Sequence, residues 1–221
     1  MSVPMKLATF LFLCACMVFS ASTFAAEGDI WKHPVKDSDA RAIDSAFAPM
    51  TAHKVIRGDF KQTKFIAQLN KEFVSNGKFV IANDKGILWN TEKPFPSSLA
   101  ISETRMIQQN ANGSRTEINA NDNVVFAQIA KTIQSVFSGS TAKLQAGFHV
   151  YFTRNGKNWT VGLIPKEPSV KKAIESIELS GSTWLDKIRL VDGSKSPLLY
   201  ELSNPKPAGG LTPEEQALLE K

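Results

Sequence analysis

Cysteine is nearly absent from this sequence of 221 residues, and the two that occur, Cys14 and Cys16, lie together near the N-terminus. The rest of the chain has no thiol, which excludes disulfides, cysteine-ligated metals and cysteine nucleophiles there. Histidine is also scarce: His33, His53 and His149 are scattered, and no two lie at ligand spacing on one helix. We therefore expect neither a metal site nor a cofactor.

Motifs of nucleophilic and nucleotide chemistry are missing as well. The sequence has no Gly-x-Ser-x-Gly, and the Ser-x-x-Lys match from Ser169 to Lys172 lacks the other motifs that give it meaning. No glycine-rich loop precedes a predicted helix, so a phosphate cradle is unsupported. These absences predict a protein that binds a molecule without transforming it, and not an enzyme.

Long apolar runs are absent after Ala26, where no window offers the roughly 18 uncharged apolar residues that a spanning helix needs. Charge is dispersed too: Lys and Arg number 26 against 21 Asp and Glu, for a net charge of +5, with no block of one sign. The dispersed charge argues against nucleic-acid binding. We expect a globular domain without a membrane-spanning helix.

The N-terminus is typical of a secretory signal peptide over residues 1–26. Lys6 precedes an apolar stretch, and small residues end at Ala25 and Ala26, where cleavage is expected. An alternative stays open, because the residues around Cys16 also resemble a lipoprotein processing site that would leave Cys16 lipidated and membrane-anchored. Soluble export to the periplasm is the favoured interpretation, since the apolar stretch continues past Cys16.

Most of the chain after residue 54 has the pattern of antiparallel strands. Four Asn-Gly or Asp-Gly pairs and one Asp-Lys-Gly stretch suit tight turns between segments rich in β-branched and aromatic residues. They are Asn76-Gly77, Asp84-Lys85-Gly86, Asn112-Gly113, Asn155-Gly156 and Asp192-Gly193. The flanking segments alternate between apolar and polar residues, so one face of the predicted sheet is apolar.

Two amphipathic helices interrupt this pattern, over residues 39–54 and 123–137, and Pro49 should kink or end the first. A loosely held lead-in is expected over residues 27–37. We expect one domain over residues 27–205, then a Pro/Gly linker and a short helix over residues 206–221.

The predicted fold class is α+β and mainly β. A single sheet of about ten strands must curl, and two helices cannot fill its concave side as fully as a helical layer would. Two outcomes remain open: a closed barrel or sandwich whose apolar face is all core, which the pattern alone favours, or an incomplete barrel with a lined hollow.

Short motifs in a fixed order resemble the periplasmic outer-membrane lipoprotein carrier family (LolA-like). They are Gly58-Asp59-Phe60-Lys61-Gln62, Gly77-Lys78-Phe79, Gly86-Ile87-Leu88-Trp89, Lys93-Pro94 and the run from Asp192 to Tyr200. The resemblance implies an incomplete, curved antiparallel β-barrel whose concave apolar face is covered by helices. It also implies a carrier or chaperone that holds acyl chains between sheet and helices.

By this resemblance, the two helices form the cover and the strands form the wall of a hydrophobic cavity. The inward helix residues would be Phe47, Met50, Phe126, Ile133 and Phe137. The wall residues would be Phe60, Phe79, Ile81, Ile87, Trp89, Ile101, Phe148, Phe152, Trp159, Leu163 and Ile188. Ordinary core packing is the alternative for each of them.

The resemblance further implies an inner-membrane exporter as donor, an outer-membrane acceptor and a protein that acts as a monomer. One position departs from the family: Asn83-Asp84 stands where characterised carriers have a basic residue and Pro that latch the cover. This departure raises the alternative of a related carrier for another lipophile, such as a glycolipid or polyene lipid. A lipid-sensing interaction module and an enzyme acting on an acyl ligand are the remaining alternatives.

Overall fold

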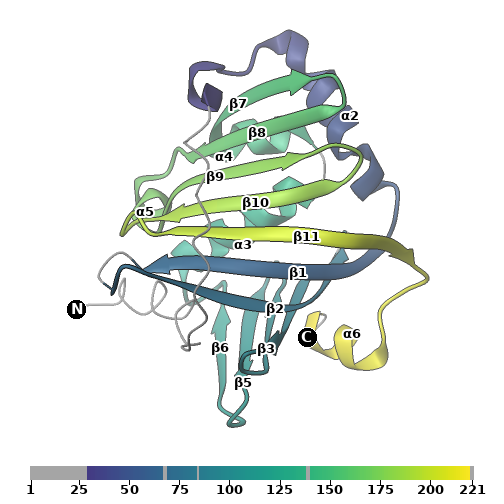
Figure 1. The fold of residues 1–221 in the computed structure, drawn as a ribbon, viewed down its shortest axis with the longest axis vertical. Coiled ribbons are helices and arrows are strands. Elements are labelled where there is room, and N and C mark those ends of the chain that lie inside the picture. The colour runs from purple at the N-terminus through teal and green to yellow at the C-terminus, as the bar shows by residue number, and fades with distance from the viewer. Residues whose placement is uncertain (1–28, 67–68, 84, 138–139, 220–221) are drawn as a thin grey trace.

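An eleven-stranded antiparallel sheet is the main element of the computed structural model, which describes residues 29–66, 69–83, 85–137 and 140–219. The strand order is β6-β5-β4-β3-β2-β1-β11-β10-β9-β8-β7, so β6 and β7 are the two ends of an open sheet. Figure 1 shows β7 to β11 with β1 and β2 crossing the view, while β3, β5 and β6 run steeply away from them. The sheet is therefore curled but not closed, which confirms an incomplete barrel in place of a closed one, while the lined hollow expected with it stays a prediction.

The strands have the following bounds. They are β1 Val55–Ile66, β2 Lys71–Ala82, β3 Gly86–Lys93, β4 Ser97–Ile101, β5 Arg105–Asn110, β6 Arg115–Asn119, β7 Phe148–Asn155, β8 Asn158–Pro165, β9 Ile174–Gly181, β10 Leu185–Asp192 and β11 Pro197–Ala208. Strand β11 pairs with β1 as far as Ala208, so it continues into the segment expected to be a linker.

Four of the five predicted turns join neighbouring strands: Asn112-Gly113, Asn155-Gly156, Asp192-Gly193 and the residues before Gly86, of which Asp84 lies outside the described residues. The prediction of a turn at Asn76-Gly77 is wrong, because both residues lie inside β2. Gly77 serves another purpose: a Cβ atom there would lie 2.0 Å from the Asn90 carbonyl oxygen of β3. The glycine lets two strands approach closely at a β-bulge.

The helices are η1 Asp29–Lys32, η2 Asp37–Asp39, α2 Ala40–Thr51, α3 Val124–Phe137, α4 Thr141–Gly147, α5 Pro168–Lys171 and α6 Pro213–Leu219. Both predicted amphipathic helices are present, although α2 ends at Thr51, short of residue 54, and contains Pro49. Figure 1 shows α3 and α4 behind the curled sheet, on its concave side. The side chains of α2 that face the sheet, including Ile43 and Phe47, are fully buried.

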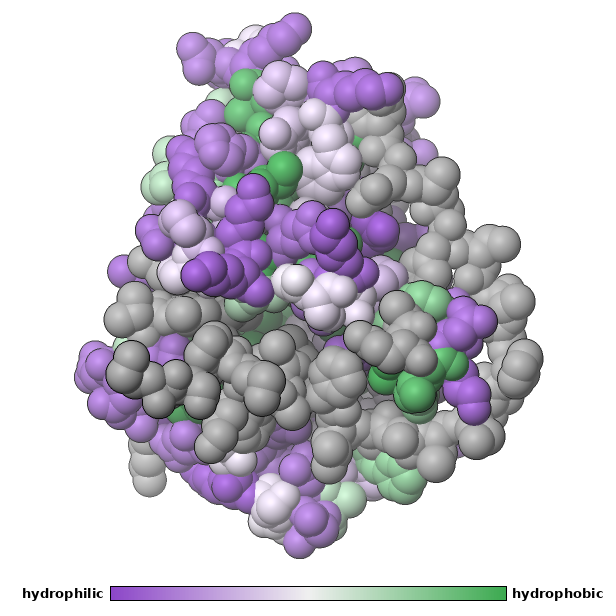
Figure 2. Space-filling model, turned by 90° about the vertical axis from the view of Figure 1, so that its left-hand side faces the viewer, coloured by the Kyte–Doolittle hydropathy of each residue, from purple (hydrophilic) through white to green (hydrophobic). Residues whose placement is uncertain are grey.

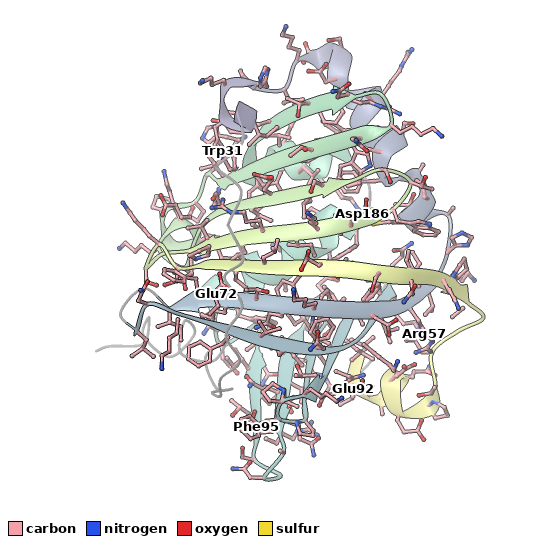
Figure 3. All side chains as sticks on the ribbon, viewed as in Figure 1. Trp31, Arg57, Glu72, Glu92, Phe95 and Asp186 are labelled. Atoms are coloured by element: carbon pink, nitrogen blue, oxygen red, sulfur yellow. The ribbon has the colours of Figure 1, made fainter. Side chains whose placement is uncertain are left out.

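Residues 29–37, expected to be loosely held, are fixed against strands β7 and β8. Pro34 bridges Tyr151, and the backbone N–H of Val35 donates to the Val150 carbonyl at 2.9 Å. Trp31 packs edge-on against Tyr151, with ring centroids 5.3 Å apart, and lies over Gly162 (Figure 3). The lead-in is therefore ordered because it covers the exposed edge of β7, which would otherwise be free to pair with another chain.

Helix α6 packs on the outer face of the sheet, where Leu219 joins a second core with Val80 and Leu88. Arg57 forms a bidentate ion pair with Glu215 (Figure 3). The hydrogen bond from Arg57 lowers the pKa of Glu215, so this contact stabilises the fold above the ordinary Glu pKa and is lost as the pH falls through the lowered value. The buried Arg105 donates to the carbonyls that end α6.

Gly58 illustrates how the sheet accommodates large rings on its concave face. Gly58 of β1 lies opposite Phe79 of β2, and a Cβ atom at Gly58 would lie 2.5 Å from the Phe79 ring and 2.8 Å from the Ser203 carbonyl oxygen. One of these neighbours is backbone, so the clash cannot be relieved by a side-chain rotation alone.

We expect Gly58→Ala to lower the free energy of unfolding by about 1–3 kcal/mol, the usual cost of overpacking. The matched control is Gly209→Ala, because a Cβ atom at Gly209 meets nothing within 4 Å. Urea denaturation of both variants measures the difference. Equal stability of the two variants would contradict the packing described here.

Candidate functional site

The concave face of the sheet carries one continuous apolar core to which helices α2, α3 and α4 contribute. Phe47 of α2 lies against Trp159 of β8, with ring centroids 5.3 Å apart. Leu144 of α4 is fully buried in the same core. The helices therefore take the place that additional strands would occupy in a closed barrel.

Most of the predicted cavity residues, from both the helices and the strands, lie in this core. It contains Phe47, Met50, Phe60, Phe79, Ile81, Ile87, Phe137, Phe148, Trp159 and Leu163, with Trp89, Phe152 and Ile188 packed against it. Phe126 of α3 is also buried, and Ile101 of β4 is half-buried. The side chain of Ile133 lies outside the described residues. Contact of any of these residues with a ligand stays a prediction.

Four aromatic rings form a cluster in the middle of the concave face, one from each of β3, β2, β1 and β11. The aromatic cluster consists of Trp89, Phe79, Phe60 and Tyr200. Trp89 is central to it, with ring centroids 5.6 Å from Phe60, 5.9 Å from Phe79 and 5.3 Å from Tyr200. The cluster brings together the aromatic residues of both Gly-x-Phe motifs, because those motifs lie on neighbouring strands.

Two polar groups are held within this aromatic cluster. The Nε1 atom of Trp89 is buried and has no hydrogen-bond partner among the residues that the structure describes. Burial raises the pKa of the Tyr200 hydroxyl, so that group stays protonated and neutral. The cluster is therefore uncharged and predominantly apolar.

The end of α2 is attached to the sheet by Asn83, which lies in the turn between β2 and β3. The Asn83 side-chain amide donates to the carbonyl oxygens of Met50, at 2.9 Å, and His53, at 2.6 Å. Asn83 therefore ties the end of the helical cover to the β2–β3 turn.

Helices α2 and α4 are also joined to each other. The Asp44 carboxylate accepts hydrogen bonds from the Thr141 backbone N–H, at 3.0 Å, and from the Thr141 hydroxyl, at 2.6 Å. Asp44 thus satisfies the first N–H group of α4, whose N-cap residue is Ser140. The two helices are therefore coupled parts of the cover.

A cleft of about 620 Å³ opens beside α3 and α4. Its lining comes from these two helices, the β4–β5 turn, the end of β8 and α5: Glu103, Lys131, Gln134, Ser135, Lys143, Ala146, Gly147, Phe148, Pro165, Lys166, Glu167 and Val170. Figure 2 turns the side that carries α5 toward the viewer and shows small apolar areas between hydrophilic ones. Phe148 belongs to both the cleft and the concave core, so the two are adjacent.

Several of these features were not predicted from the sequence. Helix α4 is short and has no clear apolar period. Tyr200 was predicted only as the end of the run from Asp192, and not as a residue of the apolar site. The cleft lysines come from separate elements, so no local motif marks them. The capping pattern of Ser140, whose hydroxyl accepts from the Lys143 N–H at 3.4 Å, is the one local signal that could have indicated α4.

The described residues contain no cluster of His, Cys, Asp or Glu suited to a metal ion. Within the same part of the chain, no helix is long and apolar enough to cross a bilayer. The chemistry that this site offers is burial of apolar surface.

The chain matches the sequence model of one protein family. Residues 51–215 match the family model described as outer membrane lipoprotein carrier protein LolA, which covers most of the sequence. The chain therefore belongs to the LolA family, whose members are carriers, and the family is associated with lipid binding. A search of curated proteins finds no match.

Solved structures with a similar fold share little sequence with this chain. A LolA superfamily protein from Nitrosomonas europaea is 9% identical with a TM-score of 0.46, covering 80% of this chain and 96% of its own. A DUF1329 family protein from Desulfovibrio piger is 8% identical with a TM-score of 0.44, covering 81% and 98%. LprF from Mycobacterium bovis is 10% identical with a TM-score of 0.36, covering 81% and 97%.

We expect Asn83→Ala to loosen the end of α2 while the sheet stays folded. Losing two hydrogen bonds to carbonyl oxygens should cost about 1–3 kcal/mol. Hydrogen exchange of the amides in the last turn of α2 should accelerate more than exchange in β1. Asn158→Ala, on the exposed start of β8, is the control and should leave α2 unchanged; acceleration in both variants would contradict the role of Asn83.

Proposed function

We propose that this protein is a non-enzymatic periplasmic carrier that shields the acyl chains of a lipoprotein or related lipid in transit from the inner to the outer membrane. The observation that carries this proposal is an open sheet whose apolar concave face is covered by helices. Membership of the lipoprotein carrier family supports the same role. The acyl chains would lie between the helical cover and the aromatic cluster.

The physical requirement for such a carrier is strong. Each methylene buried contributes about 0.8 kcal/mol, so a long acyl chain has a negligible free concentration in water. A carrier must replace the water around the chain with an apolar lining. It must also release the chain, which requires a cover that can move relative to the sheet without unfolding it.

The remaining parts of this proposal follow the family. We infer an inner-membrane exporter as donor, an outer-membrane acceptor and action as a monomer, after removal of residues 1–26. A related carrier for a different lipophile is the second candidate, because Asn83 replaces the basic latch residue expected by resemblance. The two candidates share the same site and differ only in cargo.

Native mass spectrometry of the gently purified protein tests the function. A carrier should retain lipid at up to one ligand per chain, and the mass of the released lipid identifies the cargo. Repeated preparations without any bound lipid, and no uptake of added lipid, would contradict the proposal. Turnover of the lipid by the protein alone would indicate an enzyme instead.

We expect Trp89→Ala to reduce lipid uptake at least several-fold, since it removes the central ring of the aromatic cluster. The matched control is Trp31→Ala, which removes a tryptophan that packs on Tyr151 away from this cluster. Uptake per folded molecule, measured by mass spectrometry and normalised by circular dichroism, separates binding from folding. If uptake falls only in proportion to the folded fraction, Trp89 is ordinary core.

A further inference from the structure

The cleft beside α3 and α4 has a cationic rim built by three separate elements. Lys131 comes from α3, Lys143 from α4 and Lys166 from the residues that follow β8, and all three line the cleft and are exposed. The fold thus brings together three positive charges that come from three different parts of the sequence. We call these three residues the cleft lysines.

The other charged groups of the cleft offset only part of the charge of the cleft lysines. Two carboxylates, Glu103 and Glu167, share the lining. Glu167 accepts a hydrogen bond from the Ser169 hydroxyl at 3.2 Å, and the Lys166 ammonium donates to the Gln145 carbonyl. Among the residues that the structure describes, no ion pair involves Lys131 or Lys143. With three lysines against two carboxylates, the lining carries a formal net charge of +1.

The inner side of the same cleft is apolar. Phe148, Pro165 and Val170 are buried residues of its lining, and Phe148 also belongs to the concave core. A volume of about 620 Å³ lies within the range of small-molecule sites. The cleft thus combines a charged rim with an apolar wall that adjoins the concave core at Phe148.

We propose that this cleft binds the anionic headgroup of the lipid whose acyl chains enter the concave core, so that the protein selects negatively charged lipids. This inference rests on the proposed function, because the headgroup site is placed relative to the acyl site. A phosphate or carboxylate group suits the cleft lysines, whose ammonium groups act as mobile point charges. The side-chain amide of Gln134 in the lining can add a hydrogen bond, whereas the Ser135 hydroxyl already donates to the Lys131 carbonyl at 2.8 Å.

The position of the cleft lysines makes the selectivity sensitive to salt. All three are exposed, so their attraction for an anion is screened by added salt, with a Debye length of about 8 Å at physiological ionic strength. Binding of the acyl chains depends on apolar burial and is not weakened by salt in this way. Headgroup selectivity and total binding should therefore separate as the salt concentration rises.

In the experiment, the delipidated full-length protein is mixed with lipid vesicles. The vesicles contain equal amounts of phosphatidylglycerol and phosphatidylcholine with the same acyl chains. Native mass spectrometry then counts each lipid bound. We expect a preference of about tenfold for phosphatidylglycerol at low salt, falling toward unity at high salt. The Lys131→Gln/Lys143→Gln variant should lose most of the preference while its total lipid uptake stays within about twofold.

Lys157→Gln/Lys187→Gln is the matched control, since it removes the same charge from exposed positions outside the cleft lining. It should keep the preference. Glycerol phosphate alone, as a competitor, separates a lipid headgroup site from a site for free anions: we expect no competition, and full displacement by this fragment would contradict the lipid assignment.

The outcomes distinguish the two proposals. Equal uptake of both lipids by the wild type, or a preference lost equally in the control variant, would overturn the headgroup site and leave the carrier function standing. Uptake of neither lipid would overturn the carrier function itself.

Discussion

The structure depends on one constraint: an apolar concave sheet that does not close on itself. Strands β6 and β7 end the sheet without pairing to each other. In a closed barrel the apolar face would be sealed by strands, whose hydrogen bonds are lost only by unfolding. Here α2, α3 and α4 seal it through side-chain packing and a few hydrogen bonds. A cover of this kind can shift without breaking the sheet, and the proposed uptake of acyl chains requires such a shift.

The two faces of the sheet are used differently, which follows from the strict alternation of the strands. In β2, Phe79 and Ile81 enter the concave core, while Val80 enters the outer core with Leu219 of α6. The outer core is fixed by the Arg57–Glu215 ion pair and by Arg105 at the end of α6. The concave cover is held by Asn83 and by the Asp44–Thr141 contact. The two layers are therefore held to the sheet by separate sets of contacts.

Local patterns made much of the fold predictable. The alternation of apolar and polar residues identified the strands, and four turns were found from three Asn-Gly or Asp-Gly pairs and the Asp-Lys-Gly stretch. The error at Asn76-Gly77 arose because the same dipeptide suits both a turn and a bulge, and only the partner strand decides between them. The gathering of these aromatic residues on one face followed from periodicity, and their role as the wall of a ligand cavity stays a prediction. The ordering of residues 29–37, the bonds of Asn83 and the cleft lysines depend on contacts between distant segments, which no local pattern encodes.

The most direct test of the central claim is photo-crosslinking with a fatty acid that carries a diazirine on its chain, followed by peptide mapping of the adducts. Because side chains alternate along a strand, adjacent residues of β2 and β3 lie on opposite faces of the sheet. The position of an adduct therefore identifies the face that the fatty acid contacted. The account predicts adducts on concave residues, above all Phe79 and Trp89 with the facing positions of α2 and α3. Adducts confined to outer residues such as Val80 and Leu88, or spread evenly over both faces, would contradict it.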